Sequence, residues 1–390
     1  MNTQRILIFS TAYFPIVGGA EVAIQEITER ISLYEFDLIT PRLRRDLSSF
    51  EKIGATNVYR VGIGSSLDKF LIPVLGVFMA FRLHKKHAYK AIWSMMASQA
   101  SVAASFFSFL SRVPLLLTLQ EGDEEEHLHR YVGGNLFLYR LLIRPWYVSV
   151  YKRATRITAI STHLKKRAVL IRKDVPIDII PNGVDVERFG AKIESATLDK
   201  IRKGFGFSLE SKIICTASRL VKKNAVGDVI RALPLLPPDV CFVICGTGHL
   251  HDSLVKLSDE LGVSSRVRFL GHKNHDELVE ILQASDISIR PSLSEGLGNS
   301  FIESMMAGVI TIGTPVGGIP DFLKEGMTGF FCEPSNPESI SKAVYRALRL
   351  SDAEREALRI RAQTCVLERY TWKKVSVQMK QVFDRLCEFS

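Results

Sequence analysis

The stretch ISIRPSLSEGLGNSFIE, residues 287–303, combines a strand, a glycine-containing loop and the start of a helix. Residues 287–290, in which Ile287 and Ile289 alternate with polar residues, indicate a buried strand that ends at Pro291, and a helical pattern begins near Asn299. Glu295 lies in the loop and Glu303 in the first turns of the helix. A strand that leads through a tight loop into a helix is the repeating unit of α/β proteins. The stretch therefore predicts a parallel sheet that is covered by helices.

The same alternation of short apolar runs and helical patterns occurs along the whole chain. In the first half, strands are predicted at 6–9, 36–40, 58–61, 91–94, 115–119, 156–160 and 178–181, with helices that include 21–31, 70–86 and 136–153. In the second half, strands are predicted at 212–217, 240–245, 267–270, 287–290 and 309–312, with helices that include 228–236 and 276–284. The turn-rich PNGVD at 181–185 separates the two series. We therefore predict two tandem doubly wound (Rossmann-like) α/β domains, 1–185 and 186–370, that face a cleft.

The composition is typical of a folded globular protein. Hydrophobic residues make up 46% and charged residues 24% of the 390 residues, so disorder is not expected. The first residues lead directly into a strand, and the longest apolar runs, 70–81 and 100–110, are shorter than the roughly 18 residues of a membrane span. The six cysteines are expected to be small apolar core residues rather than metal ligands. We therefore expect a cytoplasmic protein.

The positive charge is concentrated in the first half of the chain. The net charge is +10, and residues 1–190 hold 25 Lys+Arg against 17 Asp+Glu. This asymmetry indicates an anionic partner, which can be nucleic acid, acidic lipid or a phosphorylated acceptor, or else a solvated basic surface. No aromatic RNA-binding motif and no helix-turn-helix pattern is visible in the sequence, so nucleic acid is not expected as the partner.

A basic helical segment at 137–156 suggests where such a partner binds. Cations such as Arg140 and Arg144 alternate with apolar residues such as Phe137 and Trp146. This composition is typical of helices that lie on an anionic membrane surface. The alternative is that the apolar stripe packs on the sheet of the first domain, although Pro145 would kink the helix and free one half from the sheet. Peripheral binding to the inner face of the membrane is therefore one hypothesis.

Charged residues follow two strands at the edge where such sheets bind their ligands. Glu295 and Glu303 flank the start of a helix, whose free N–H groups suit a phosphate. Their carboxylates suit the vicinal hydroxyls of ribose and sugar, because an ionised carboxylate accepts from two donors. Arg219 follows the strand at 212–217 and precedes Lys223 by four residues, which makes a clamp for a diphosphate leaving group.

Glycine-bearing turns follow three of the predicted strands. Glycine allows the backbone to approach a ligand closely. None of these turns has the G-x-G-x-x-G spacing, so a nicotinamide cofactor is not expected. The turns contain Gly18 and Gly19, Gly246 and Gly248, and Gly317 and Gly318.

These motifs together resemble those of the retaining glycosyltransferases of family four, which have the GT-B fold. The resemblance runs nearly from end to end and includes FPIVGGAE at 14–21, IPNGVD at 180–185, SRLV at 218–221, CGTG at 245–248, FLG at 269–271, SEGLG at 294–298 with Glu303 after it, and TPVGGIP at 314–320. It implies a hexosyltransferase that uses a nucleoside-diphosphate sugar, with UDP favoured over GDP. It also implies retention of the anomeric configuration, with the leaving phosphate taking the acceptor proton, and no cofactor.

The resemblance also implies roles for individual residues. Arg219 and Lys223, with Lys222 as the alternative to Lys223, would hold the donor diphosphate. Glu295 would face the donor sugar, and Glu303 would accept hydrogen bonds from the ribose. The other donor contacts are expected from Gly18, Gly19, Gly246, Gly248, Gly271, His272, Gly296, Leu297, Gly298 and Asn299. Contacts with the acceptor or the sugar are expected from Gln120 and Glu121. The C-terminal helix at 371–390 is expected to cross back to the first domain.

The chain departs from the family pattern at four positions. Ser218 stands where glycine is common, Asn224 where the clamp lysine is usual, Gln120 where a histidine often follows the fifth strand, and Ser304 where alanine is common. No Asp-x-Asp is present and the histidines lack ligand spacing, so no metal ion is expected. The acidic run at 123–126 is interpreted as a solvated loop or an edge of the acceptor site.

Three acceptor classes remain open: a glycan, as in polysaccharide biosynthesis, a lipid-linked acceptor, or a small molecule. A nucleotide-sugar epimerase or a phosphorylase is an alternative, because one fold supports several reactions. A nucleotide-sugar-binding protein without turnover is another alternative. The presence of Arg219, Glu295 and Glu303 argues against lost activity.

Overall fold

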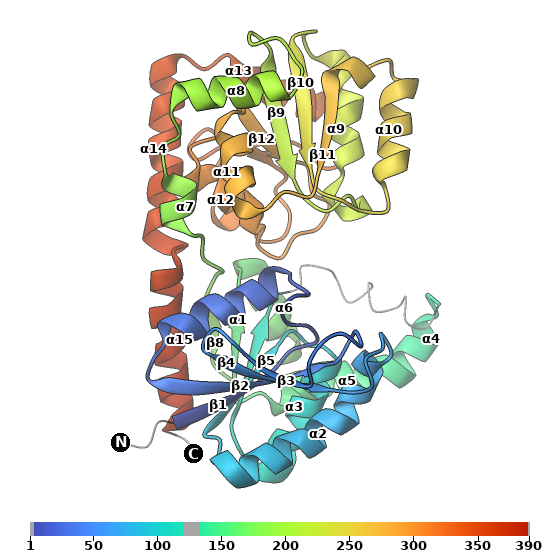
Figure 1. The fold of residues 1–390 in the computed structure, drawn as a ribbon, viewed down its shortest axis with the longest axis vertical. Coiled ribbons are helices and arrows are strands. Elements are labelled where there is room, and N and C mark those ends of the chain that lie inside the picture. Colours follow the sequence, from blue (N-terminus) through green and yellow to red (C-terminus); the bar gives the residue numbers. More distant parts are fainter. Residues whose placement is uncertain (1–3, 121–132, 389–390) are drawn as a thin grey trace. The chain divides into compact units, whose positions relative to one another are not determined.

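The computed structural model describes residues 4–120 and 133–388. The chain divides into two compact units, Met1–Gly183 with Trp372–Ser390, and Val184–Thr371 (Figure 1). Each unit is a sheet with helices on both faces, so the predicted doubly wound α/β architecture is confirmed.

The first unit contains an eight-stranded sheet in the order β3-β4-β2-β1-β5-β6-β7-β8. Its strands are β1 (Gln4–Phe9), β2 (Tyr34–Pro41), β3 (Phe50–Ile53), β4 (Thr56–Val61), β5 (Ala91–Met95), β6 (Leu115–Leu119), β7 (Arg156–Ala159) and β8 (Ile177–Ile179). All pairs are parallel except β3 with β4. The sequence did not predict β3, because this edge strand is only four residues long and none of its side chains is buried.

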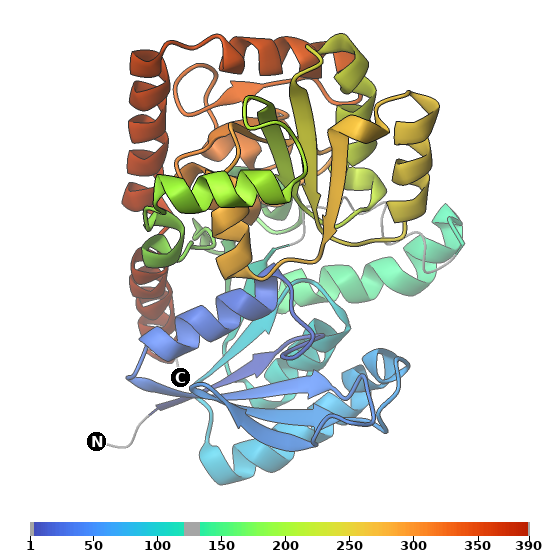
Figure 2. The same ribbon diagram turned by 45° about the horizontal axis from the view of Figure 1, so that its top comes forward.

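Helices cover the two faces of this sheet with separate hydrophobic cores. They are α1 (Gly19–Arg30), α2 (Asp68–His87), α3 (Gln99–Ser111), α4 (Leu136–Leu138), η2 (Tyr139–Ile143), α5 (Arg144–Arg153), α6 (Thr162–Ile171) and α15 (Trp372–Cys387). The helices α1 and α15 pack beside each other on one face, and α2 and α3 cover the other (Figures 1 and 2). The last helix of the chain thus completes the core of the first unit through Trp372, Met379 and Phe383.

The predicted helix at 136–153 consists of three consecutive helical segments. A short α4 passes into η2, a π-helical stretch, before α5 begins at Arg144. Pro145 is the second residue of α5 and follows the π-helical stretch, so it has no N–H to donate to a carbonyl of the preceding turn. The helical segments follow one another without a break from 136 to 153, and the predicted kink at Pro145 stays a prediction.

The second unit contains a six-stranded, all-parallel sheet in the order β11-β10-β9-β12-β13-β14. Its strands are β9 (Lys212–Ala217), β10 (Val240–Cys245), β11 (Val267–Gly271), β12 (Ile287–Arg290), β13 (Ile310–Gly313) and β14 (Phe330–Phe331). Its helices are α7 (Val186–Gly190), α8 (Ser195–Gly204), η3 (Lys222–Asn224), α9 (Val226–Ala232), η4 (Leu233–Leu235), α10 (His251–Glu260), η5 (Ser264–Arg266), α11 (His275–Gln283), α12 (Asn299–Met306), η6 (Ile319–Asp321), α13 (Pro337–Leu348) and α14 (Asp352–Arg369).

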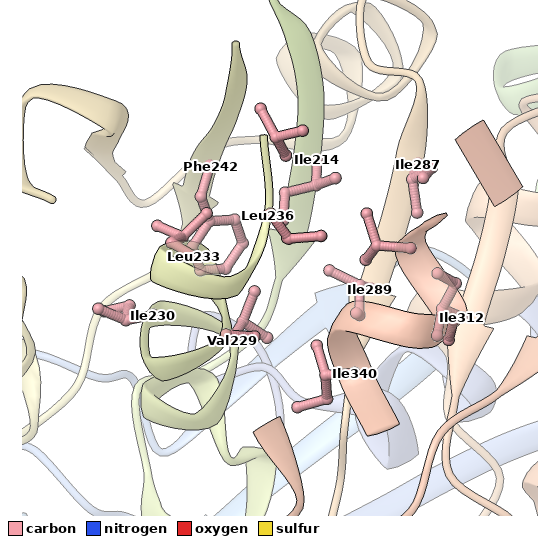
Figure 3. Packing of buried hydrophobic residues seen from close by; sticks show 14 of the residues in the cluster. Ile214, Val229, Ile230, Leu233, Leu236, Phe242, Ile287, Ile289, Ile312 and Ile340 are labelled. Carbon is pink, nitrogen blue, oxygen red and sulfur yellow. The ribbon is translucent and has the colours of Figure 1, made fainter. Parts of the chain in front are cut away.

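The core of the second unit explains why its strands are rich in apolar residues. Strands of a parallel sheet are buried on both faces, so most of their side chains are apolar. Ile214, Phe242 and Ile289 from three neighbouring strands lie in one cluster, and Val229 and Leu233 from the α9–η4 segment pack on them (Figure 3). Complete burial of such a side chain stabilises the fold by about 1.5–3 kcal/mol. This packing holds the carboxyl ends of the strands, and the loops after them, in a defined arrangement.

Candidate functional site

The predicted site residues of the second unit gather along the carboxyl edge of its sheet. Arg219 and Lys223 follow β9, Gly246 and Gly248 follow β10, Gly271 and His272 end and follow β11, and residues 295–299 follow β12. The carboxyl ends of parallel strands share one edge, which is where open α/β sheets bind ligands. The fold therefore brings together loops that are up to 80 residues apart in sequence.

Backbone hydrogen bonds join the loops after β9, β10 and β11. The N–H of Ser218 donates to the carbonyl of Cys245 at 3.0 Å, and the N–H of Leu220 donates to the carbonyl of Thr247 at 2.9 Å. The N–H of Gly246 donates to the carbonyl of Gly271 at 2.7 Å. These bonds make the three loops a single ordered segment of the edge.

Further bonds join the loop after β12 to its neighbours on both sides. The N–H of Leu293 donates to the carbonyl of Lys223 at 2.7 Å, and the hydroxyl of Thr314 donates to the carbonyl of Ser292 at 2.5 Å. The segment that carries Glu295 is thus held between the β9 loop and the β13 loop.

The glycines of these loops are required by the contacts between loops. A Cβ atom on Gly246, whose φ is +140°, would lie 1.9 Å from the carbonyl oxygen of Ser218. A Cβ on Gly248 would lie 2.3 Å from the carbonyl oxygen of Leu220, and one on Gly317 would lie 1.8 Å from that of Glu295. The sequence assigned these glycines to close approach of a ligand. The structure shows that they allow close approach of a neighbouring loop, which any side chain would prevent, and their contacts with a ligand stay a prediction.

Arg219 and the two lysines after it occupy different environments. Arg219 is exposed, and its backbone carbonyl accepts a hydrogen bond from the buried Asn224 amide at 2.7 Å. Asn224, which stands where the clamp lysine is usual in the family, therefore holds the conformation of the loop and does not supply a cation. Lys223 is half-buried, and its carbonyl accepts the hydrogen bond from the N–H of Leu293. Lys222 is exposed and lines a cavity of about 490 Å³ beside α9 and α10. This difference favours Lys223 over Lys222 as the clamp lysine.

Arg290, which the sequence analysis did not select, is the main partner of Glu295. Arg290 is the last residue of β12, and its Nη2 lies 2.6 Å from Oε2 of Glu295. Its Nε donates to Ser292 and its Nη1 to Ser300, at 3.1 and 3.0 Å, and the guanidinium lies 4.5 Å from the centre of the Phe301 ring. The side chain of Glu295 is thus held in an ion pair at the edge of the sheet. A charged residue at the carboxyl end of a short buried strand is the signal that identifies Arg290.

Glu303 lies in the second turn of α12 in a contrasting environment. Its side chain is partly exposed, and among the described residues no donor forms a hydrogen bond with its carboxylate. Burial raises the pKa of Glu303 to about 7, and the positive charge of Arg290 acts in the opposite direction. Ser304, the next residue, donates to the hydroxyl of Ser288 at 2.8 Å and so fixes α12 on β12. The carboxylate is thus close to half-ionised at neutral pH and available for a ligand.

The loop into α12 offers backbone groups rather than side chains. Gly298 is the N-cap in a left-handed conformation with φ +96°, and no side chain caps the helix. Gly296, Leu297 and Gly298 are buried, and the side chain of Leu297 belongs to the core rather than to the surface of the site. The uncapped N–H groups and the positive end of the helix dipole are suited to an anion.

The candidate residues of the first unit follow β1 and β6. Gly18 and Gly19 are exposed at the start of α1, and the N–H of Gly18 donates to the carboxylate of Glu21 at 2.7 Å. The amide of Gln120 exchanges two hydrogen bonds with the amide of Asn182, at 3.1 and 3.2 Å, so part of its capacity is already used within the unit. Glu121 and the acidic run at 123–126 lie outside the described residues.

Two family models match the chain and together cover most of its length. "Glycosyltransferase Family 4" matches residues 17–188, and "Glycosyl transferases group 1" matches residues 198–364. The chain belongs to glycosyltransferase family 4. The family resemblance of its motifs is therefore confirmed, and glycosyl transfer is its general activity.

Relatives and solved structures that are similar to this glycosyltransferase are consistent with the family assignment. An uncharacterized glycosyltransferase of Methanocaldococcus jannaschii is 28% identical over 97% of this chain and 98% of its own. N-acetyl-alpha-D-glucosaminyl L-malate synthase of Bacillus anthracis is 28% identical over 58% of each chain. The crystal structure of Anabaena HepE in complex with UDP-glucose has a TM-score of 0.79, at 19% identity, over 98% of this chain and 99% of that chain. The predicted GT-B fold is confirmed.

Neither a metal-binding group of side chains nor a membrane-spanning helix is present in the described part of this glycosyltransferase. Across residues 4–120 and 133–388, no three His, Cys, Asp or Glu side chains are grouped so as to hold a metal ion. Over the same residues, no helix has the length and apolar character needed to cross a bilayer.

Proposed function

We propose that this glycosyltransferase moves a hexose from a nucleoside-diphosphate sugar, with UDP favoured over GDP, onto a glycan, a lipid-linked acceptor or a small molecule. The observation that carries the proposal is the presence of Arg219 and Glu303, without an ion pair among the described residues, at the edge where Arg290 and Glu295 are paired with each other. The HepE complex with UDP-glucose supports a nucleotide-sugar donor. The Bacillus synthase, whose name includes L-malate, supports a small-molecule acceptor as one class.

In the proposed reaction, the diphosphate lies at the uncapped N-terminus of α12, with Arg219 and Lys223 beside it. The bond between the anomeric carbon and the phosphate oxygen breaks, and negative charge grows on the phosphate. Fixed cations and N–H groups at that position stabilise the transition state more than the ground state. The acceptor oxygen bonds to the anomeric carbon on the same face, so configuration is retained, and its proton passes to the leaving phosphate. Glu303 accepts from the ribose hydroxyls, and Arg290 positions Glu295 beside the sugar.

The donor is tested by thermal unfolding in the presence of individual nucleotide sugars. A donor at about 100 times its dissociation constant adds about 2.7 kcal/mol to the free energy of unfolding. UDP-sugars are expected to stabilise the protein more than GDP-sugars. If no nucleotide sugar stabilises it, the proposal is wrong. Release of UDP from the stabilising donor then separates an enzyme from a binding protein without turnover.

Independence of metal is tested by chelation. We propose that Arg219, Lys223 and the α12 N-terminus neutralise the diphosphate, so transfer should continue at an unchanged rate in EDTA. The measurement is the initial rate with and without EDTA, followed by addition of Mg²⁺ or Mn²⁺. A complete loss that a divalent cation reverses would contradict this part of the proposal.

A further inference from the structure

One side of α2 presents a stripe of large apolar residues to solvent. Phe70, Leu71, Val74, Leu75 and Phe78 are all exposed, and Phe78 has 72% of its surface accessible. Their spacing places them on one side of a helix with 3.6 residues per turn. The opposite side of α2 is buried in the core below the sheet. The stripe is therefore additional to what the core of the unit requires.

The neighbouring helices α3 and α5 extend this apolar surface. In Figure 1, α2, α3 and α5 lie on the same side of the sheet of the first unit, and α3 contacts both of the others. Phe106 of α3 and Trp146 of α5 are exposed, and their ring centres are 5.8 Å apart. Phe109 of α3 is exposed as well, with the guanidinium of Arg153 5.9 Å from its ring centre. We call the exposed side chains of α2, α3, η2 and α5 the outer helical face.

The charges of the outer helical face are almost entirely positive. Its helices contain eight Lys and Arg, of which four are on α2, one on η2 and three on α5. Their only acidic residue is Asp68, which is buried and accepts hydrogen bonds from the N–H groups of Gly64 and Ser65 at 2.8 and 3.1 Å. Exposed Arg82, Lys85 and Lys86 continue α2 beyond its apolar stripe.

We propose that the outer helical face docks on an anionic lipid bilayer, with its apolar side chains in the interface and its cations on the headgroups. Amphipathic surfaces with aromatic residues and flanking Lys and Arg bind membranes in this way. A second copy of the same face is a poor occupant, because a symmetric contact would place like charges opposite one another. The proposal concerns this surface alone and does not depend on the donor chemistry.

The structure changes which residues carry the membrane hypothesis. The sequence pointed to the segment at 137–156, but Val150 and Tyr151 are buried there. Arg153 donates to Ser108 at 2.7–3.0 Å, and Arg156 is paired with Asp178. The exposed apolar residues of that segment lie in its first part, at Phe137, Leu138, Leu141 and Trp146, and α2 supplies the longer apolar stripe.

The test is co-sedimentation of the full chain with vesicles of phosphatidylcholine alone or mixed with phosphatidylglycerol. We expect binding to the anionic vesicles at about 50 mM NaCl and release at about 500 mM, where screening is strong. Each surface cation contributes about fivefold to the partition coefficient, so Lys85→Glu with Lys86→Glu should reduce binding by about 25-fold or more. Phe78→Ser should reduce it by about tenfold through lost apolar contact.

Matched controls lie outside the outer helical face. Val377→Ser alters an apolar residue that is 54% exposed on α15 of the same unit, and Lys203→Glu alters an exposed cation on α8 of the second unit. Both should bind vesicles like the natural chain. All variants should keep their unfolding temperature and their rate of donor hydrolysis without vesicles, which separates this test from that of the proposed function.

Three results would overturn the proposal. One is the absence of binding to anionic vesicles at low salt. Another is equal loss of binding in the face variants and the controls. The third is a dimer in sedimentation velocity that Phe78→Ser converts to a monomer without any vesicle binding, which would make the face an interface between copies.

Discussion

Arg290 and Glu295 neutralise each other, whereas Arg219 and Glu303 have no ion pair or hydrogen bond to their charged groups among the described residues. All four lie at or beside the carboxyl edge of the same sheet. A charge that is paired inside the protein contributes to stability, because its partner would otherwise be left uncompensated. A charge without a partner does not stabilise the fold, and a desolvated one lowers its stability, but it is available to a ligand. The two pairs should therefore respond to mutation in opposite ways.

Removing an unpaired cation should affect catalysis and leave folding unchanged. Arg219→Ala should lower kcat by about 100- to 1,000-fold, because Arg219 acts as charge develops on the leaving phosphate. Its free energy of unfolding should change by less than about 0.5 kcal/mol, since the side chain is exposed. The measurements are initial rates and urea denaturation, with Lys203→Ala on α8 as the control. Full activity in Arg219→Ala would remove Arg219 from the site.

Removing a cation that is held in an ion pair should lower the free energy of unfolding. Arg290→Met should lower the free energy of unfolding by about 2–4 kcal/mol, because it leaves the half-buried carboxylate of Glu295 without its partner. Adding Glu295→Gln should restore most of this stability but not the rate of transfer. Denaturation curves and kcat of the single and double variants provide the comparison. A double variant as unstable as Arg290→Met would show that the loss of stability does not come from the broken ion pair.

Donor affinity should depend on the ionisation of Glu303. With a pKa of about 7, the carboxyl is protonated in acid and then accepts fewer hydrogen bonds from the ribose. The dissociation constant of UDP should rise as the pH falls below 7, by up to about tenfold per pH unit. Titration calorimetry should find this dependence in the natural chain and not in Glu303→Gln. In Glu303→Ala the dissociation constant of UDP should be several-fold higher than in the natural chain at alkaline pH. An unchanged dissociation constant would show that Glu303 does not contact the ribose.

The same raised pKa predicts how stability depends on pH. The folded state holds a proton on Glu303 between the ordinary pKa of 4.5 and about 7, where the unfolded state has lost it. Stability from this group is therefore present at low pH and is lost as the pH rises through that window. Glu303→Gln should be more stable than the natural chain by about 1–2 kcal/mol above pH 7 and similar to it near pH 4. Glu280→Gln on α11 is the surface control, and an equal gain there would contradict the assignment.

The fold could be predicted because its strands are short segments rich in apolar residues, bounded by turn residues. The strands β6, β9, β10 and β12 begin and end at the predicted residues. The errors fall where local pattern is weakest: β3 has no buried side chain, and the segment around Pro145 reads as one helix although η2 interrupts it. An edge strand and a π-helical stretch depend on their neighbours more than on their own periodicity.

The sequence by itself determined which loops meet at the carboxyl edge, because the order of strand, loop and helix places Arg219, Glu295 and Glu303 after parallel strands. Only the tertiary structure decided that Arg290 pairs with Glu295, that Glu303 titrates near neutrality and that Gly246 makes room for Ser218. It also decided that the apolar stripe of α2 faces outward. The physical reason is that ion pairing, desolvation and steric exclusion depend on groups supplied by distant segments, whereas strand and helix patterns are local.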